Sequence, residues 1–174
     1  MRASLQEAGH NLNVGDEGGF APSLPSNEHA VEALLAAIDM AGYRPGYDCF
    51  IGIDVAATEL WIDGNYVLPR ENKILNSLQM VDYYAKLAAT YPIISIEDGM
   101  AEDDWHGWQV LMDKLGHQVQ LVGDDLYTTN VVRIQRGIEE KSSNSVLIKL
   151  NQIGTLSETL DAMELATSAG WSNV

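Results

Sequence analysis

Short apolar runs that alternate with amphipathic stretches restrict the fold of this chain more than any other feature. Four runs are rich in Ile and Val and apolar on both faces, as the strands of a covered parallel sheet are, and a fifth, weaker run precedes them. The runs span residues 49–54, 92–98, 119–125 and 146–151, and the weaker one spans 12–17. Helical patterns lie between them. This alternation predicts an α/β fold of repeated β-α units.

The helical stretches carry recognisable start and stop signals. Residues 26–27 (Ser-Asn) open the first long one and Gly42 ends it. Asn130 opens a later helix, and Thr155 with Glu158 has the spacing of a capping box at the start of the last. We therefore predict helices bounded by these residues.

Three further elements follow from local patterns. Asp63-Gly64 is a turn signal between short β-favouring segments and predicts a hairpin inserted after the second strand. Residues 171–174 resemble the start of another strand, which brings the count to about six. In the last helix the apolar spacing predicts a buried stripe of Leu156, Leu160 and Met163, although the helices at both ends of the pattern lack an obvious outer neighbour.

Composition limits the functional classes. The chain has 174 residues, enough for one domain with a hydrophobic core, and residues 1–174 contain no evident linker. Its formal net charge of −15 argues against a nucleic-acid partner, which requires a basic face. The same charge fits either a site that collects metal cations or a solvated acidic surface.

Cysteine content and hydropathy bear on location. Cys49 is the single cysteine, so no intrachain disulfide can form, which fits a reducing compartment such as the cytoplasm. No apolar run approaches the roughly 18 residues of a membrane helix, and residues 1–10 do not read as a signal peptide. We expect a cytoplasmic protein that does not bind membranes.

Ionisable residues stand at the end of each predicted strand. Glu17, Asp54, Glu97, Asp124 and Lys149 follow or close successive runs, about once per β-α unit. Because the carboxyl ends of parallel strands lie on one face of the sheet, separate units would bring these groups together.

Such a group of carboxylates favours a hard divalent cation. Clustered carboxylates repel each other and lose hydration, and a cation offsets both costs. Oxygen ligands suit Mg²⁺, and no His or Cys has zinc-ligand spacing. Lys149 lies in an apolar run, where burial and a cation would lower the pKa of its amine and make it a usable base. A simple ion pair between Lys149 and a carboxylate explains the same position equally well.

Five segments, in this order, closely resemble the signature segments of enolases, the bacterial type in particular. They are GDEGGFAP, IGIDVAATEL, YPIISIEDGMAEDDW, QLVGDDLYTTN and SVLIKLNQIGTLSETL. The resemblance extends over essentially the whole chain. It implies an enolase-type (β/α) TIM-like barrel, incomplete with about six of eight strands, and the Mg²⁺-dependent interconversion of 2-phosphoglycerate and phosphoenolpyruvate in glycolysis.

The resemblance also implies roles for individual residues. Asp54, Glu97 and Asp124 match the family's metal ligands. Lys149 matches the general base that removes the C2 proton, and Glu17 matches the general acid that helps the C3 hydroxyl to leave. Both also fall in the family's substrate site. A protonated Glu17 would need a raised pKa, which we expect from its carboxylate surroundings. The full-length family members are typically dimers or higher oligomers.

The chain departs from the family in length. By this resemblance we expect it to lack counterparts of the N-terminal α+β domain and of the end of the barrel. In the family the end of the barrel supplies much of the positive charge that binds the substrate. Two hypotheses therefore stand: the central catalytic part of an enolase, or a catalytically inactive fragment with a structural or interaction role. A magnesium-dependent phosphatase on a doubly wound sheet is a third, which Val55 and Ala56 after Asp54 disfavour, because its nucleophile strand normally carries two Asp one residue apart.

Overall fold

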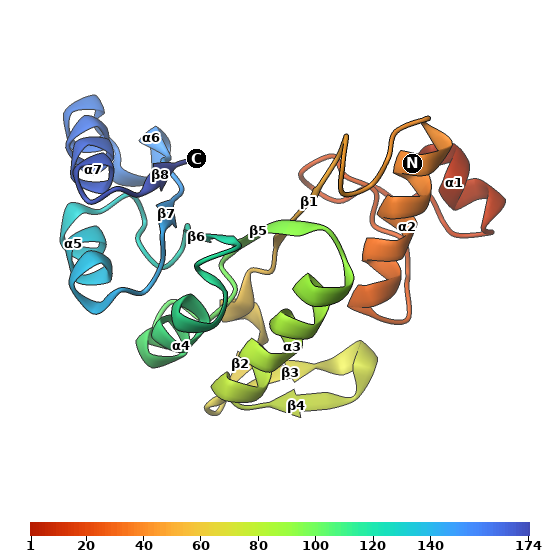
Figure 1. Ribbon diagram of the computed structural model, residues 1–174, viewed down its shortest axis with the longest axis horizontal. Helices are drawn as coiled ribbons and strands as arrows, with labels where there is room; N and C mark the ends of the chain where they lie inside the picture. The colour runs from red at the N-terminus through yellow and green to blue at the C-terminus, as the bar shows by residue number, and fades with distance from the viewer.

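The main sheet of the computed structural model, which describes residues 1–174, has five parallel strands (Figure 1). They are β1 (Ile51–Asp54), β5 (Ile93–Glu97), β6 (Gln120–Gly123), β7 (Ser145–Val146) and β8 (Ser172–Asn173), in that spatial order. The order follows the chain without reversal, as in a β/α barrel, whereas a doubly wound sheet reverses at a switch point. The sheet is open, with β1 and β8 at its edges. The α/β prediction is confirmed.

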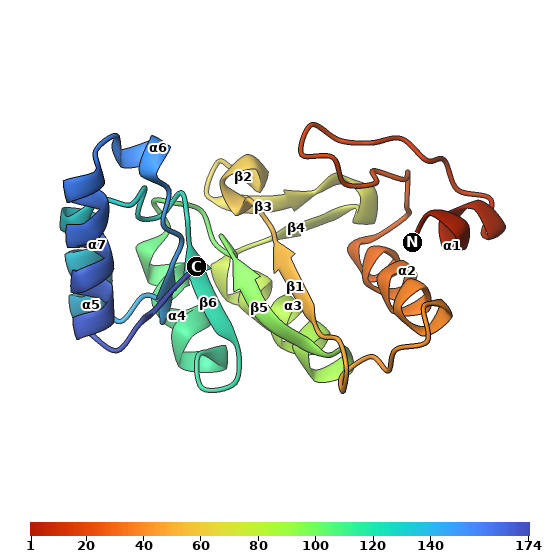
Figure 2. The same cartoon turned by 90° about the horizontal axis from the view of Figure 1, so that it is seen from above.

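Seven α-helices accompany the strands. They are α1 (Arg2–Glu7), α2 (Asn27–Met40), α3 (Ser77–Thr90), α4 (Trp105–Leu115), α5 (Val131–Glu140), α6 (Leu150–Ile153) and α7 (Leu156–Ser168). Helix α3 packs against α4, and α5 packs against α7. Figure 2 shows α1 and α2 at one end of the molecule and α5 with α7 at the other. No helix is both long enough and apolar enough to span a bilayer.

The predicted helix boundaries are confirmed by their caps. The Ser26 side chain accepts a hydrogen bond from the backbone N–H of His29 at the start of α2. Asn130 caps α5, and Thr155 accepts from the backbone N–H of Glu158 at the start of α7. Each side-chain oxygen pairs with a backbone N–H that has no partner inside the helix, which is why these residues mark helix starts.

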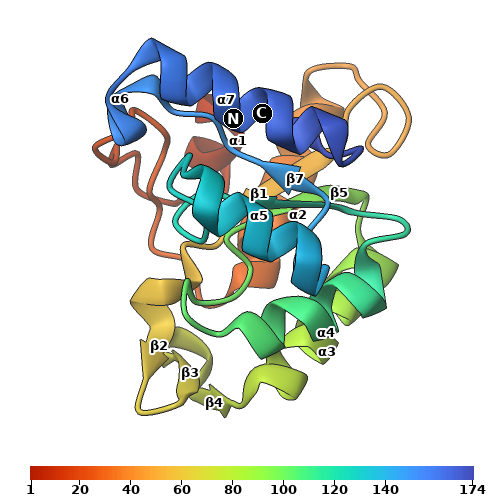
Figure 3. The same cartoon turned by 90° about the vertical axis from the view of Figure 1, so that its left-hand side faces the viewer.

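The predicted hairpin is present and belongs to a second sheet. Strands β2 (Trp61–Ile62), β3 (Asn65–Leu68) and β4 (Lys73–Leu75) form an antiparallel sheet, with the 3₁₀ helices η1 (Ala57–Leu60) and η2 (Pro69–Glu71) beside them. Asp63 and Gly64 both have positive φ, 49° and 80°, as the hairpin turn demands. Figure 3 shows this small sheet far from α7. The strand β4 was not predicted.

Aromatic side chains join the hairpin sheet to the main core. Trp108 on α4 and Tyr66 on β3 are fully buried. The Tyr66 hydroxyl donates to Asp104 Oδ2 at 2.8 Å and accepts from the backbone N–H of Ala101 at 3.0 Å. The buried hydroxyl is thus fully paired, so the loop between β5 and α4 is held against the hairpin.

The prediction of a strand near the start of the chain is wrong. Residues 12–17 form no strand of the main sheet; only one local antiparallel bridge joins Val14 to Phe20. Val14 is 58% exposed, and the backbone N–H of Gly15 bonds to the Gly19 carbonyl, so the chain folds back on itself here. The main sheet therefore has five strands rather than about six.

The buried face of α7 is also not the predicted one. Leu156, Leu160 and Met163 are 63%, 54% and 37% exposed. The small residues Thr159, Ala162 and Ala166 face inward instead. They allow α7 to pack closely on α5, and no element of the chain covers the larger side chains.

Candidate functional site

The carboxyl ends of β1, β5 and β6 bring acidic residues to one edge of the main sheet. Asp54 and Glu97 are paired Cα partners at the ends of β1 and β5. Asp124 follows directly after β6, which pairs with β5. Lys149 reaches this edge from the loop after β7, where its ammonium forms an ion pair with Asp124. The convergence expected from a parallel sheet is therefore present for these four residues.

The position of Lys149 differs from the prediction. Strand β7 ends at Val146, and Lys149 is the N-cap of α6 rather than a strand residue. Its side chain is 42% exposed, so it is not the buried amine expected from the apolar run. Of the two interpretations that the sequence left open, the ion pair is the contact that the structure contains.

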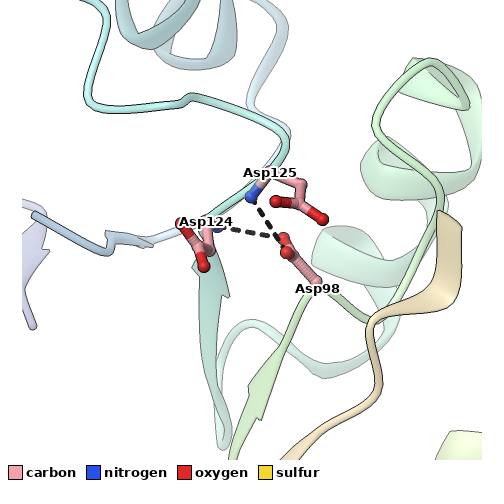
Figure 4. A group of neighbouring side chains, drawn as sticks. All are labelled: Asp98, Asp124 and Asp125. Carbon is pink, nitrogen blue, oxygen red and sulfur yellow. Dashed lines mark hydrogen bonds between the residues drawn. The ribbon is translucent and has the colours of Figure 1, made fainter. Parts of the chain in front are cut away.

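Asp98, Asp124 and Asp125 form the tightest group of carboxylates in the protein. One oxygen of each lies within 4.8 Å of the others (Figure 4). Asp124 alone belongs to the predicted ligand set, and Asp54 and Glu97 lie outside this tight group. The residues that follow the predicted ligands thus add to the negative charge at this edge.

The Asp98 carboxylate binds the backbone of the loop that follows β6. Its two oxygens accept the backbone N–H groups of Asp124 and Asp125, each at 2.9 Å, as the dashed lines in Figure 4 show. The residue is only 4% exposed, so water does not easily replace it. These charge-assisted hydrogen bonds fix the loop that carries Asp124 to the end of β5.

Strained backbone conformations gather at the same edge. Ala56, Asp98, Thr128 and Thr129 all have positive φ, between 42° and 55°. A positive φ is especially unfavourable for the β-branched Thr residues. Such conformations persist only where the surrounding structure enforces them, and they concentrate at functional sites. This concentration is a second observation, separate from charge, that favours a functional site at the strand ends.

Burial and crowding raise the pKa of two carboxyl groups. The pKa of Glu97 is raised to about 7, first by burial and then by the charges of Asp54 and Asp124. The pKa of Asp98 is raised to about 6, chiefly by burial, against the lowering effect of its two backbone hydrogen bonds. Concentrated negative charge of this kind is what a bound cation relieves.

The pKa of the Lys149 amine is raised, whereas the sequence analysis expected it to be lowered. Its hydrogen bond to Asp124 raises the pKa of Lys149 above the usual lysine value, and burial lowers it by less. Among the protein's own groups, Lys149 is therefore held in its charged form. A cation bound beside Asp124 would act in the opposite direction and lower the pKa of Lys149.

Glu17 is not connected to the other candidates. It lies in the exposed segment between α1 and α2 and makes no side-chain hydrogen bond or ion pair. The neighbouring backbone is a tight turn in which Gly18 N–H bonds to the Gly15 carbonyl and Gly18 has φ 84°. The predicted acid thus stands on a glycine-rich loop whose fold does not hold the carboxyl group in place.

The sequence analysis assigned no role to four residues of the site. Two of them, Asp98 and Asp125, directly follow the predicted ligands Glu97 and Asp124, so the doubled acidic pairs were visible in the sequence. Gln152 donates from Nε2 to Asp124 Oδ1 at 3.1 Å, and its spacing of three from Lys149 on a helical turn was a second signal. Buried Thr129, which contacts Gln152, had no sequence signal.

A cavity of about 500 Å³ lies between α2, β1 and α3, and Asp54 is among its lining residues. Most of its lining is apolar, including Val31, Ile53 and Leu87. Of the carboxylate and lysine centre only Asp54 lines this cavity, so the cavity does not define the site.

The fold and the site together define an open β/α-barrel domain with a carboxylate and lysine centre at the carboxyl ends of its strands. Residues 2–174 match the family model described as the enolase C-terminal TIM barrel domain. The chain belongs to this family. With the unreversed strand order, the match decides against the phosphatase hypothesis.

Proposed function

We propose that the chain carries the catalytic part of an enolase, which dehydrates 2-phosphoglycerate to phosphoenolpyruvate and catalyses the reverse hydration. The family match and the five signature segments support this reaction. The observation that carries the proposal is the contact between Lys149 and Asp124 beside Glu97. It joins an amine to an acidic cluster where a barrel places its active site.

Mg²⁺ is the cofactor that we propose for Asp54, Glu97 and Asp124. The donor set consists of carboxylate oxygens, which a hard cation prefers. Burial first, and then the charges of Asp54 and Asp124, raise the pKa of Glu97, and a cation would offset the part due to charge. Bound there, Mg²⁺ would stabilise the negative charge that develops on the substrate carboxylate and lower the pKa of Lys149.

The proposed chemistry assigns one proton transfer to each of two residues. Lys149, in its neutral form, takes the proton from C2 of 2-phosphoglycerate. The electron pair of the broken C–H bond forms the C2–C3 double bond as the C3 hydroxyl leaves. Protonated Glu17 donates a proton to that hydroxyl, which departs as water. The assignment of Glu17 rests on the sequence resemblance.

The setting of the reaction is proposed on the same grounds. Glycolysis takes place in the cytoplasm, which agrees with a single cysteine. The partner is a small-molecule substrate, with no role for nucleic acid or membrane, and a homodimer or higher oligomer is expected for the full-length form. An open sheet with two free edges keeps the inactive fragment as the competing proposal.

The deciding experiment adds 2-phosphoglycerate and Mg²⁺ to purified residues 1–174 and follows phosphoenolpyruvate by its absorbance. Product formation that stops with EDTA supports the enolase proposal. A folded, inactive chain beside an active longer chain supports the fragment proposal. In an active chain Lys149→Ala should abolish exchange of the C2 proton with solvent while Mg²⁺ still binds. Normal exchange in that variant would exclude Lys149 as the base.

A further inference from the structure

Both oxygens of the Asp124 carboxylate are held by one short segment. Lys149 Nζ donates to Oδ2, and Gln152 Nε2 donates to Oδ1 at 3.1 Å. Lys149 is the N-cap of α6 and Gln152 lies one turn further along it, so the two side chains reach the same carboxylate. Asp124 is 7% exposed, so these contacts largely replace its hydration.

Thr129 forms hydrogen bonds to both Lys149 and Gln152. Its hydroxyl accepts the backbone N–H of Lys149 at 2.9 Å and donates to Gln152 Oε1 at 3.1 Å. Thr129 is fully buried and has a φ of 55°, which a β-branched residue adopts only when its surroundings enforce it. The strained residue thus supplies the hydroxyl that links Lys149 to Gln152.

The direction of every hydrogen bond in this chain follows from its chemistry. An ionised carboxylate only accepts, so Gln152 must turn its NH₂ group towards Asp124. The Gln152 oxygen then faces Thr129, whose single hydroxyl proton satisfies it. The remaining acceptor capacity of that hydroxyl takes the Lys149 backbone N–H. The Thr129 hydroxyl also lies 3.4 Å from the Leu147 carbonyl oxygen, a longer contact than the one to Gln152 Oε1. With the hydroxyl proton on Gln152 Oε1, the donors Lys149 and Gln152 fix the plane of the Asp124 carboxylate.

We propose that Gln152 and Thr129 are positioning residues that orient Asp124 and Lys149 for a divalent cation and for proton transfer. The second half of this inference rests on the proposed enolase function; the first half requires only that Asp124 binds a cation. Hydrogen bonds of this kind behind a metal ligand typically change metal affinity about 10- to 100-fold.

Matched variants separate positioning from folding. Gln152→Ala removes the donor to Asp124, and Thr129→Val removes the hydroxyl while keeping the shape. Thr129→Ser restores the hydroxyl. Gln135→Ala is the control, because Gln135 also donates to a carboxylate, that of Glu139 at 2.8 Å, but on the exposed surface of α5. Mg²⁺ affinity is measured by titration calorimetry on the purified chain, and urea unfolding in EDTA reports stability.

We expect Gln152→Ala and Thr129→Val to weaken Mg²⁺ affinity by about 10-fold or more. Thr129→Ser and Gln135→Ala should stay within about threefold of the parent chain. The unfolding curve of Gln152→Ala should change little, because Gln152 is only partly buried.

Unchanged Mg²⁺ affinity in both Gln152→Ala and Thr129→Val would overturn the inference, and so would a parent chain that binds no Mg²⁺. Loss of affinity in Thr129→Ser equal to that in Thr129→Val would exclude the hydroxyl as the cause. A parent chain that binds Mg²⁺ but forms no phosphoenolpyruvate would refute the proposed activity of this chain, while the variant affinities would still decide the positioning role.

Discussion

Asp98 gives the most direct test of the electrostatics at the strand ends. It is 4% exposed, and burial raises its pKa from 3.8 to about 6. The native state therefore holds this proton more tightly than the unfolded chain does. Protonation stabilises the fold below about pH 4, and this contribution is lost as the pH rises through about 6. The free energy of unfolding should fall with rising pH in that window.

The size of the effect follows from the shift. A change of about two pKa units corresponds to about 3 kcal/mol over the whole titration, as an upper limit. Between about pH 5 and pH 7.5, roughly 1 kcal/mol of this remains to be lost. That range also keeps the strongly acidic chain well charged in solution.

Asp98→Asn removes the titrating group and retains one acceptor oxygen. Urea unfolding in EDTA is measured at several pH values for the parent chain, for Asp98→Asn and for Asp103→Asn, which changes an exposed residue. The stability of Asp98→Asn relative to the parent should rise by roughly 1 kcal/mol from about pH 5 to pH 7.5. A constant offset from lost hydrogen bonds does not alter this slope. Parallel curves for parent and Asp98→Asn would refute the reasoning.

Three further predictions address binding and packing. Asp124→Asn should weaken Mg²⁺ binding in calorimetry, because it removes a carboxylate charge, and an unchanged titration would exclude Asp124 as a ligand. Gly137→Ala should destabilise the protein by about 1–3 kcal/mol in urea unfolding, since the new Cβ would lie 2.5 Å from the buried Tyr127 ring, and an unchanged midpoint would contradict this packing. Leu160→Ser should change stability by no more than about 0.5 kcal/mol, because Leu160 is exposed on α7, and a larger loss would mean that α7 is covered in solution.

Local signals in the sequence predicted most of the fold. Apolar runs, caps such as Ser26 and Asn130, and the Asp63-Gly64 turn depend on neighbours within a few residues, so they can be read along the chain. The prediction for residues 12–17 was wrong because a strand needs a partner as well as a pattern. The buried face of α7 was predicted wrongly for a related reason, since burial depends on which element lies opposite.

The sequence by itself determined the β-α order and the acidic or basic residue that closes each unit, and hence the candidates Asp54, Glu97, Asp124 and Lys149. Only the tertiary structure decided how they meet. It placed Lys149 at the start of α6 in contact with Asp124, and it paired the Asp98 carboxylate with the backbone of the loop after β6. It also brought Gln152 into hydrogen-bond contact with Asp124 and with buried Thr129. The reason is physical: residue type and order are properties of the chain, whereas a hydrogen bond between distant residues exists only after packing has brought donor and acceptor together.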